Sequence, residues 1–497
     1  MDSGNSLQPQ RNTGPRLSEG SLFERSSPGR QGFELPPLEV PRRTPQHYSR
    51  ASAAELPEVS ELDVVRHFTR LSTKNYGVDL GTFPLGASTM KYNPRLNEEL
   101  AALPGFTDIH PDMPTELCQG ALELIFRLEQ MLTNIAGLDE CSLQPAAGAH
   151  GEFTALSLIR AFHQTHGSHR KYVLIPDSVT GTPPAAYGLA GYEAIALKSG
   201  DNGICSLETV QAATQKYGRD IAALMLTNPN SAGLFEANIV GIAELIHGIG
   251  AQVYMDGANM NAILGVALPR DMGIDVLQYH LHKTFSTPHG GGEAGAGPVA
   301  VRSHLAPYLP APRVRWVENR YVLETPEATI GKVRAGFGNF GGFVRAIAYI
   351  LAHGRDGLRR ISGAAVLNAN YVRARLSEHY QIGFPTPSFQ ACTFTDARQL
   401  PKGVKALTIA QWLIDKGFPP PTVYSQLLLP GVMLIEPTET ESLQELDSLV
   451  SAFIEIAKSI EAGEKVDDAP TKTIVARVDE VRVARHPVLT LDDRSEP

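Results

Sequence analysis

Short apolar runs recur between residues 115 and 300, each followed by a glycine-rich turn and then by a segment with helical spacing. The clearest runs are KYVLIPDS (171–178), AALMLTNPN (222–230), AQVYMDGA (251–258) and IDVLQYHLHK (274–283). Such uninterrupted apolar character is typical of parallel strands that helices cover on both faces. Helical spacing at 153–162 and 237–250 predicts two covering helices, and 294–301 is expected to add a strand. The pattern indicates an α/β protein with a large, mostly parallel sheet.

The pattern changes after residue 310. Segments 343–354 and 364–376 have the spacing of amphipathic helices, and TIAQWLIDKGF (408–418) followed by VMLIEPTE (432–439) indicates a smaller α+β domain. The first 55 residues are rich in Pro, Arg, Ser and Gly and predict an extended or disordered arm. We therefore expect an arm over 1–55, a large domain over 56–310, a smaller C-terminal domain over 311–464 and a charged tail over 465–497.

Composition narrows the class of protein. The chain has 497 residues, of which 42% are apolar and 20% charged, as in an ordinary globular protein. Its net charge of −9 argues against binding to nucleic acid or an anionic membrane. No apolar run reaches the ~18 residues of a membrane-spanning helix, and the N-terminus lacks the apolar core of a secretory signal. Four widely spaced cysteines form neither a disulfide framework nor a metal-binding motif, which favours a cytoplasmic protein.

Lys283 is the first candidate for chemistry. In an open parallel sheet, ligands bind beyond the carboxyl ends of the strands, and Lys283 ends one of the apolar runs. It is flanked by His282 and followed by the glycine cluster PHGGGEAGAG, which lets a backbone approach a bound group closely. A surface lysine beside a flexible loop would give the same local sequence. The functional alternative is a lysine that forms a Schiff base, for which its amine must be neutral and nucleophilic.

Asp256 favours the functional alternative. It ends the apolar run QVYM, where an unpaired carboxylate would be costly. The pyridinium N–H of pyridoxal phosphate would satisfy it, and the ion pair would keep the ring an electron sink. Ala258 is small enough to lie against the ring face. An aspartate that merely caps the next turn remains the alternative.

Small residues at a predicted helix start form the third element. The backbone N–H groups of Ala147-Gly148-Ala149 would suit the cofactor phosphate. His150 is expected either to bond the cofactor or to be an ordinary core histidine, and Thr227 either to contact the ring hydroxyl or to belong to a plain TNPN turn. A phosphate site, then an aspartate, then a lysine 27 residues later is the order found in fold-type I pyridoxal enzymes.

Longer motifs carry a family resemblance. QPAAGAHGE, LTNPNSAGLFE, YMDGANMNA, LHKTFSTPHGGG, STMKYNP, PPTVY and IEPTETES stand in the order of the glycine cleavage system P-protein. The chain resembles subunit 2 of the two-subunit form of that protein, from about residue 23 almost to the C-terminus.

The resemblance implies a fold-type I enzyme with pyridoxal 5'-phosphate bound to Lys283 and His282 beside it. It implies decarboxylation of glycine and transfer of the aminomethyl group to the lipoyl arm of an H-protein. It also implies a heterotetramer with a homologous subunit 1 that lacks the lysine.

Several positions depart from the family. The histidine expected to stack on the pyridoxal ring is Thr180, and a nearby asparagine is Pro183. The family sequence HLNLHK places asparagine where this chain has His280, and Glu293 puts a carboxylate into the glycine loop. A hydroxyl cannot stack on a ring, so cofactor affinity or reaction specificity is expected to differ.

Three hypotheses follow. The first is the family role in glycine decarboxylation. The second is a pyridoxal enzyme of the same frame acting on another amino acid, because a carboxylate near the substrate would suit a cationic one. The third is a non-catalytic partner that keeps only the fold, against which the presence of Lys283 and Asp256 argues.

Overall fold

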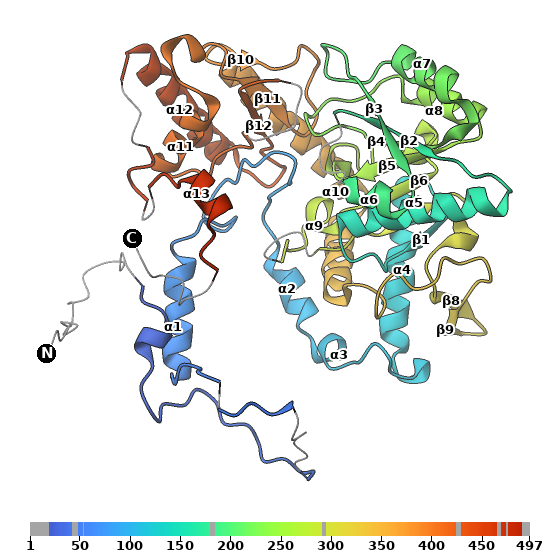
Figure 1. Cartoon of the computed structure of the whole chain (residues 1–497), viewed down its shortest axis with the longest axis horizontal. Helices are drawn as coiled ribbons and strands as arrows, with labels where there is room; N and C mark the ends of the chain where they lie inside the picture. Colours follow the sequence, from blue (N-terminus) through green and yellow to red (C-terminus); the bar gives the residue numbers. More distant parts are fainter. Residues whose placement is uncertain are drawn as a thin grey trace, which may run out of the picture. The chain divides into compact units, whose positions relative to one another are not determined.

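The computed structural model describes residues 19–41, 48–52, 54–178, 184–290, 295–423, 429–464, 469–473 and 476–489. The chain divides into two compact units: Gly81–Thr471, and a smaller unit that joins Met1–Leu80 to Lys472–Pro497. All candidate site residues that the structure describes belong to the larger unit, whose helices and strands are labelled in Figure 1. The domain boundaries expected at residues 55, 310 and 464 remain predictions.

A seven-stranded sheet forms the centre of the larger unit. Its spatial order is β1 (Glu140–Ser142), β7 (Val299–Val301), β6 (Val276–Tyr279), β5 (Gln252–Gly257), β4 (Ile221–Thr227), β2 (Tyr172–Pro176) and β3 (Glu193–Leu197). Strands β3, β2, β4, β5 and β6 are parallel, whereas β7 runs antiparallel to both of its neighbours. The predicted large, mostly parallel sheet is confirmed, and each of the expected strands lies in it.

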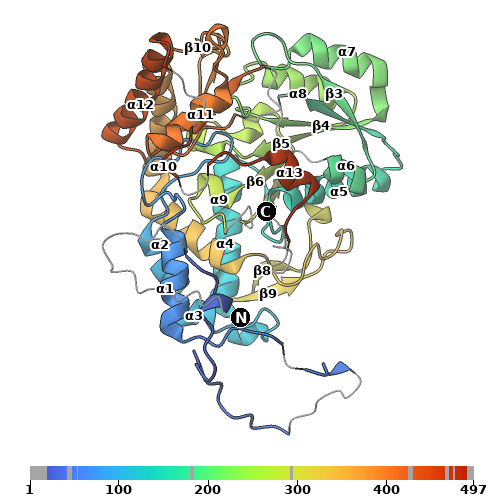
Figure 2. The same ribbon diagram turned by 60° about the vertical axis from the view of Figure 1, so that its left-hand side comes forward.

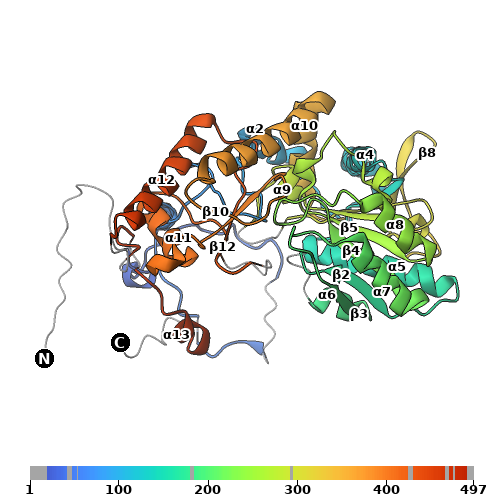
Figure 3. The ribbon, with the colours of Figure 1, turned by 90° about the horizontal axis from the view of Figure 1, so that it is seen from above.

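Helices cover both faces of this sheet. One face carries α4 (Gln119–Ala136), α7 (Leu207–Tyr217) and α8 (Ile239–Gly248), and the other carries α5 (Gly148–Thr165) with α6 (Pro184–Leu189) beside it (Figure 3). Successive strand side chains point to opposite faces. Leu224 and Leu226 of β4 therefore join the core on the α4 side, while Ala223 and Met225 join the core around α5. The helix expected over 153–162 is part of α5, and α8 lies within the segment expected over 237–250.

A second, antiparallel sheet has the order β10 (Gln381–Ile382), β11 (Cys392–Thr395) and β12 (Val432–Ile435). It packs with α11 (Ala406–Asp415), α12 (Leu443–Glu461) and the end of α10 (Phe340–Leu376) (Figure 2). The two helices expected over 343–354 and 364–376 belong to α10, which is interrupted at Gly354 where φ is 59°. Because Phe343 lies in the core of the large sheet and Leu376 in that of the small one, α10 links the two cores.

Two local features differ from the sequence prediction. The run 274–283 is not strand throughout: β6 ends at Tyr279, and Leu281–Thr284 form the helical turn α9. Residues 313–324 form a hairpin of β8 (Arg313–Val317) and β9 (Arg320–Glu324), where no strand was expected. Both residues of its turn, Glu318 and Asn319, have positive φ. A turn of this kind usually contains glycine, and that glycine is what makes it recognisable in a sequence.

The remaining helices are short or lie in the smaller unit. In the larger unit they include α2 (Arg95–Ala101) and α3 (Pro104–Thr107), and in the smaller unit α1 (Glu61–Ser72) and α13 (Glu480–Arg485). Ser60 and Asp63 form a reciprocal capping box at the start of α1. Turns of 3-10 helix cover Phe23–Arg25, Thr115–Leu117, Gly218–Asp220, Met260–Ala262, Pro269–Met272, Ala306–Tyr308 and Leu400–Lys402. Within the described ranges, every helix is too short or too polar to cross a bilayer.

Gly233 allows a test of how the small sheet is held against the turn after β4. Its φ is +79°, and a Cβ there would lie 2.1 Å from the backbone oxygen of Ala391. Gly167 has a similar φ of +68° but open space around it. Because both substitutions by alanine share the cost of left-handed backbone, Gly233→Ala should lower the free energy of unfolding by about 1–3 kcal/mol more than Gly167→Ala. Urea unfolding followed by circular dichroism measures the difference, and equal losses would contradict the packing described.

Candidate active site

The carboxyl ends of β4, β5 and β6 meet at one edge of the large sheet. Thr227 is in register with Asp256, and Asp256 with Gln278. Lys283 follows one turn after β6, in α9. The structure thus brings Thr227 and Asp256 side by side, with the turn that carries Lys283 directly after the next strand.

Lys283 is buried, with 6% of its surface exposed, so it is not the surface lysine that the sequence left open. Its Nζ donates a hydrogen bond to the backbone oxygen of Ala87 at 3.1 Å. Among the described residues, no carboxylate forms a salt bridge with it within 4.0 Å. The one described hydrogen bond of this amine goes to a neutral carbonyl. The amine can therefore form a covalent bond to a cofactor without the loss of a salt bridge.

Asp256 is buried in β5 and its Oδ1 accepts two hydrogen bonds. The backbone N–H of Ala258 donates one, and Nε2 of His280 lies 2.9 Å away. Burial raises the pKa of Asp256, but His280 and Lys283 outweigh burial and hold that pKa below its ordinary value. Because an ionised carboxylate can only accept, Nε2 of His280 must carry a proton. The hydrogen bond from Ala258 shows that Asp256 does cap the next turn, which was the alternative left open by the sequence. Both described hydrogen bonds use Oδ1, so Oδ2 can accept from another donor.

His282 lies on the side of the His280 ring that faces away from Asp256. Its Nε2 lies 3.4 Å from Nδ1 of His280, and its ring stands edge-on to that of His289. Burial lowers the pKa of His282 to about 2, with His280, His289 and Lys283 adding to the effect. His282 is therefore neutral near pH 7. A Cβ at Gly295 would lie 1.9 Å from its Nδ1, so this ring needs a glycine opposite it.

The N-terminus of α5 faces the same edge. Ala147 precedes the helix in extended conformation, and no side chain caps the first turn. A Cβ at Gly148 would lie 2.4 Å from Cε1 of His280, and one at Gly297 would lie 2.2 Å from the oxygen of Ala147. Free backbone N–H groups at the positive end of an 18-residue helix can hold a phosphate. Ala149, in the first turn, is exposed.

His150 and the TNPN segment have local structural roles. Nδ1 of His150 accepts a hydrogen bond from the backbone N–H of Ala146 at 3.1 Å, and burial lowers the pKa of His150. Asn228 bonds the backbone of Glu236 through both its amide atoms. These contacts match the structural alternatives, and a cofactor contact by His150 stays a prediction.

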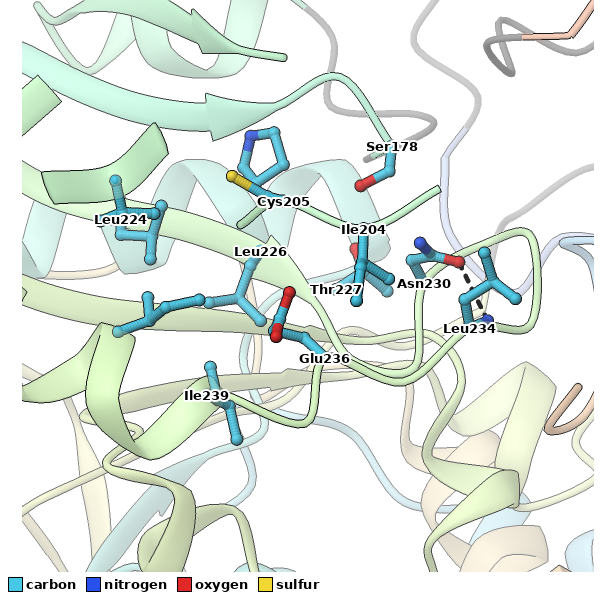
Figure 4. A pocket seen from close by; sticks show the side chains of 13 residues that line it. Ser178, Ile204, Cys205, Leu224, Leu226, Thr227, Asn230, Leu234, Glu236 and Ile239 are labelled. Carbon is cyan, nitrogen blue, oxygen red and sulfur yellow. Dashed lines mark hydrogen bonds between the residues drawn. The ribbon is translucent and has the colours of Figure 1, made fainter. Parts of the chain in front are cut away.

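Thr227 also lines a small cavity of about 30 Å³ behind the strand ends (Figure 4). Ser178, Cys205 and Glu236 line it as well, and burial raises the pKa of both Cys205, to about 12, and Glu236. A water needs roughly 10–15 Å³ and polar partners, so the cavity suits ordered water rather than a substrate.

Glu436 is a buried acid that the sequence analysis did not single out. It follows β12, and its Oε1 accepts hydrogen bonds from Oγ1 of Thr89 at 2.6 Å and Nδ2 of Asn261 at 3.3 Å. Burial raises the pKa of Glu436, against the effects of Thr89 and Lys283. A carboxylate directly after the apolar run VMLI is the signal that identified Asp256, so Glu436 could have been found. Ala87 acts through its backbone, for which no sequence signal exists.

Three candidate positions, Thr180, Pro183 and Glu293, lie outside the described residues. No group of three or more histidine, cysteine, aspartate or glutamate side chains suited to a metal ion occurs in the part of the chain that the structure describes.

The low pKa of His282 predicts a pH dependence of stability. Between about pH 2 and its unfolded pKa near 6.5, the unfolded chain binds a proton that the folded chain does not. The free energy of unfolding should therefore fall as pH drops below about 6.5, by up to ~1.4 kcal/mol per pH unit from this residue. His282→Gln should flatten that slope between pH 6.5 and 5, whereas His169→Gln, at an exposed histidine, should not. Unfolding midpoints measured across this range would contradict the prediction if both variants kept the same slope.

Solved structures share the fold. A glycine decarboxylase (P-protein) of the glycine cleavage system, in inhibitor-bound form, matches with a TM-score of 0.69 and 21% identity over 83% of this chain and 93% of that one. A tryptamine-bound Oryza sativa TDC with PLP matches with a TM-score of 0.64 and 13% identity, over 85% and 93%. These likenesses show a fold-type I architecture, as expected from the sequence.

Sequence comparison is more specific. A family profile described as "Glycine dehydrogenase, C-terminal domain" matches residues 361–477. Proteins of Bacillus licheniformis and Caldanaerobacter subterraneus, each described as "Probable glycine dehydrogenase (decarboxylating) subunit 2", are 48% and 47% identical over 94% of this chain and 98% of their own. Identity at that level over almost the whole of both chains shows that the protein belongs to the family of glycine dehydrogenase (decarboxylating) subunit 2.

Proposed function

We propose that the protein binds pyridoxal 5'-phosphate through Lys283 and decarboxylates glycine, passing the aminomethyl group to the lipoyl arm of an H-protein. The observation that carries the proposal is the buried Lys283 amine, which forms no salt bridge within the described residues, at the same sheet edge as Asp256, whose pKa is held below its ordinary value. Both occur in a chain nearly half identical to glycine dehydrogenase relatives throughout its length.

The residues present fit the cofactor. Lys283 would hold its aldehyde, Oδ2 of Asp256 its ring nitrogen, and the uncapped start of α5 its phosphate. Gly148 and Gly297 let the His280 ring and the Ala147 carbonyl approach that helix start closely, because a Cβ at either position would meet those atoms. When bound, the cofactor withdraws electrons from the carbon that loses its carboxylate.

Other proposed cofactor contacts rest on how near each residue lies to Asp256 or His280. Ala258 lies beside Asp256 and would pack against the ring face, and Thr227 adjoins Asp256 across the sheet. His282 supports the site through His280. Thr180 and His150 complete the proposed contacts, on the strength of the sequence alone.

The overall bond changes balance as follows. The bond between the glycine carbons breaks, carbon dioxide leaves, and the electron pair stays on the methylene carbon. That pair forms a bond to one sulfur of the lipoyl disulfide, which is thereby reduced. The other sulfur leaves as a thiolate and takes up a proton. Burial removes Asp256 and Lys283 from bulk water, which strengthens the electrostatic interactions that both would make with a bound cofactor.

A partner subunit is part of the proposal. The relatives are described as subunit 2, which implies a subunit 1. We extend this to a heterotetramer that receives the lipoylated H-protein. Four free cysteines, three of them buried, favour the reducing cytoplasm as its location.

Lys283→Ala should abolish the visible absorbance of the lysine-bound cofactor and lower the exchange of labelled bicarbonate into glycine by about 10³-fold or more, because the attachment point is lost. Lys216→Ala, at an exposed lysine, should change neither. Borohydride reduction followed by peptide mass spectrometry should find the cofactor on Lys283 in the unaltered protein. Attachment at another lysine would contradict the assignment.

The same exchange assay separates the second candidate function, an enzyme of this frame that acts on another amino acid. His280 beside Asp256, where the family has asparagine, favours that candidate. Bound cofactor without exchange, in the presence of subunit 1 and H-protein, would support it over glycine decarboxylation.

Thr180→His should raise glycine exchange if residue 180 controls specificity. An imidazole can stack on the cofactor ring, and aromatic stacking contributes about 0.5–1.5 kcal/mol, or up to roughly tenfold in rate. Thr180→Asn changes polarity without stacking and is the matched control. Equal rates in the histidine variant and the unaltered protein would count against this interpretation of Thr180.

A further inference from the structure

His280, which stands where the family sequence has asparagine, is the buried neighbour of Asp256. It lies between β6 and α9, and 7% of its side chain is exposed against 8% for Asp256. The two side chains meet through Nε2 of His280 and Oδ1 of Asp256 at 2.9 Å. A carboxylate–imidazole contact removed from water to this extent is a strong, oriented interaction.

The fold holds the His280 ring in place on two sides. A Cβ at residue 148 would lie 2.4 Å from Cε1, 3.1 Å from Nδ1 and 3.3 Å from Nε2, so the glycine at the start of α5 provides the space that the ring fills. On the other side, the His282 ring stands edge-on with its centroid 5.2 Å away. His280 therefore spans from the carboxylate to the helix start.

The contacts of the His280 ring indicate which of its two nitrogens carries the proton. His282 is neutral near pH 7, so one of its ring nitrogens can donate and the other can accept. Its Nε2 lies 3.4 Å from Nδ1 of His280, which can accept a hydrogen bond there while Nε2–H of His280 donates to Asp256. A hydrogen bond to one ring nitrogen of a histidine sets the orientation of the ring and which nitrogen carries the proton.

Both described hydrogen bonds to Asp256 use Oδ1. We propose that His280 is a positioning residue of the cofactor site, whose Nε2–H holds Oδ1 of Asp256 so that Oδ2 faces the cofactor's ring nitrogen. This rests on the proposed function, because it presupposes pyridoxal phosphate at Lys283.

The chemical consequence concerns the charge opposite the ring nitrogen. Burial alone favours the neutral form of a carboxyl group. The His280 hydrogen bond favours the ionised form of Asp256 and so keeps a full negative charge where a pyridinium N–H would pair with it. Without that donor, only Lys283 and the Ala258 N–H would favour the ionised form of Asp256 against burial, and protonation of the ring nitrogen would be weakened.

The test uses a pair of variants of matched length. His280→Gln keeps an N–H donor at comparable reach, and His280→Met removes it. Full-length proteins loaded with ring-¹⁵N-labelled pyridoxal phosphate are compared by ¹⁵N NMR, which reports protonation of the ring nitrogen directly. We expect the methionine variant to shift toward neutral pyridine and to bind the cofactor about tenfold more weakly, as the loss of one charge-assisted hydrogen bond implies. The glutamine variant should stay close to the unaltered protein.

The outcomes are distinct. Identical ¹⁵N shifts in the methionine variant and the unaltered protein, or equal shifts in both variants, would overturn the role of His280. If the methionine variant does not fold, as judged by circular dichroism, His280→Leu takes its place as the variant without a donor. Failure of the unaltered protein to bind the cofactor would overturn the proposed function as well, whereas normal binding and glycine exchange with unchanged ¹⁵N shifts would overturn the His280 proposal alone.

Discussion

The Asp256 carboxylate is buried where the central sheet ends, and the arrangement around it follows from the cost of burying that charge. Isolated ions are strongly disfavoured away from water, so each must be matched by donors. The protein supplies a backbone N–H from the turn after β5 and an imidazole from the turn after β6. Both donors come from segments that parallel strand order brings to the same edge. Removing either donor would weaken the stabilisation of the ionised carboxylate.

The sheet explains why distant residues meet at this edge. Parallel strands β4, β5 and β6 all point their carboxyl ends the same way, so Thr227, Asp256 and the α9 turn form adjacent positions across the sheet. Other residues near Lys283 come from the antiparallel small sheet and from the segment before α2. Glu436 follows β12, and the segment before α2 supplies the Ala87 carbonyl that Lys283 binds. The site is therefore assembled from both sheets of the larger unit.

Sequence reasoning predicted the parts of this arrangement that depend on apolar periodicity. Buried strands of uninterrupted apolar residues were identifiable, as were Asp256 and Lys283, because polar groups at the ends of such strands are unusual. The hairpin of β8 and β9 was missed because its turn, Glu318 and Asn319, reaches positive φ without a glycine. Glu436 carried the same signal as Asp256, an acid directly after an apolar run, and was overlooked. Ala87 could not have been predicted, since a backbone oxygen is independent of residue type.

The hydrogen bond from Lys283 to Ala87 restrains a segment of backbone with unusual dihedral angles. Ala87 and Thr89 both have positive φ, at 65° and 46°, so this stretch of backbone is held in a conformation that side chains other than glycine disfavour. The amine that would react with an aldehyde is one of its restraints. Covalent loading of Lys283 would make its nitrogen part of an imine and so remove the ammonium that donates to Ala87, leaving this positive-φ segment with one hydrogen bond fewer.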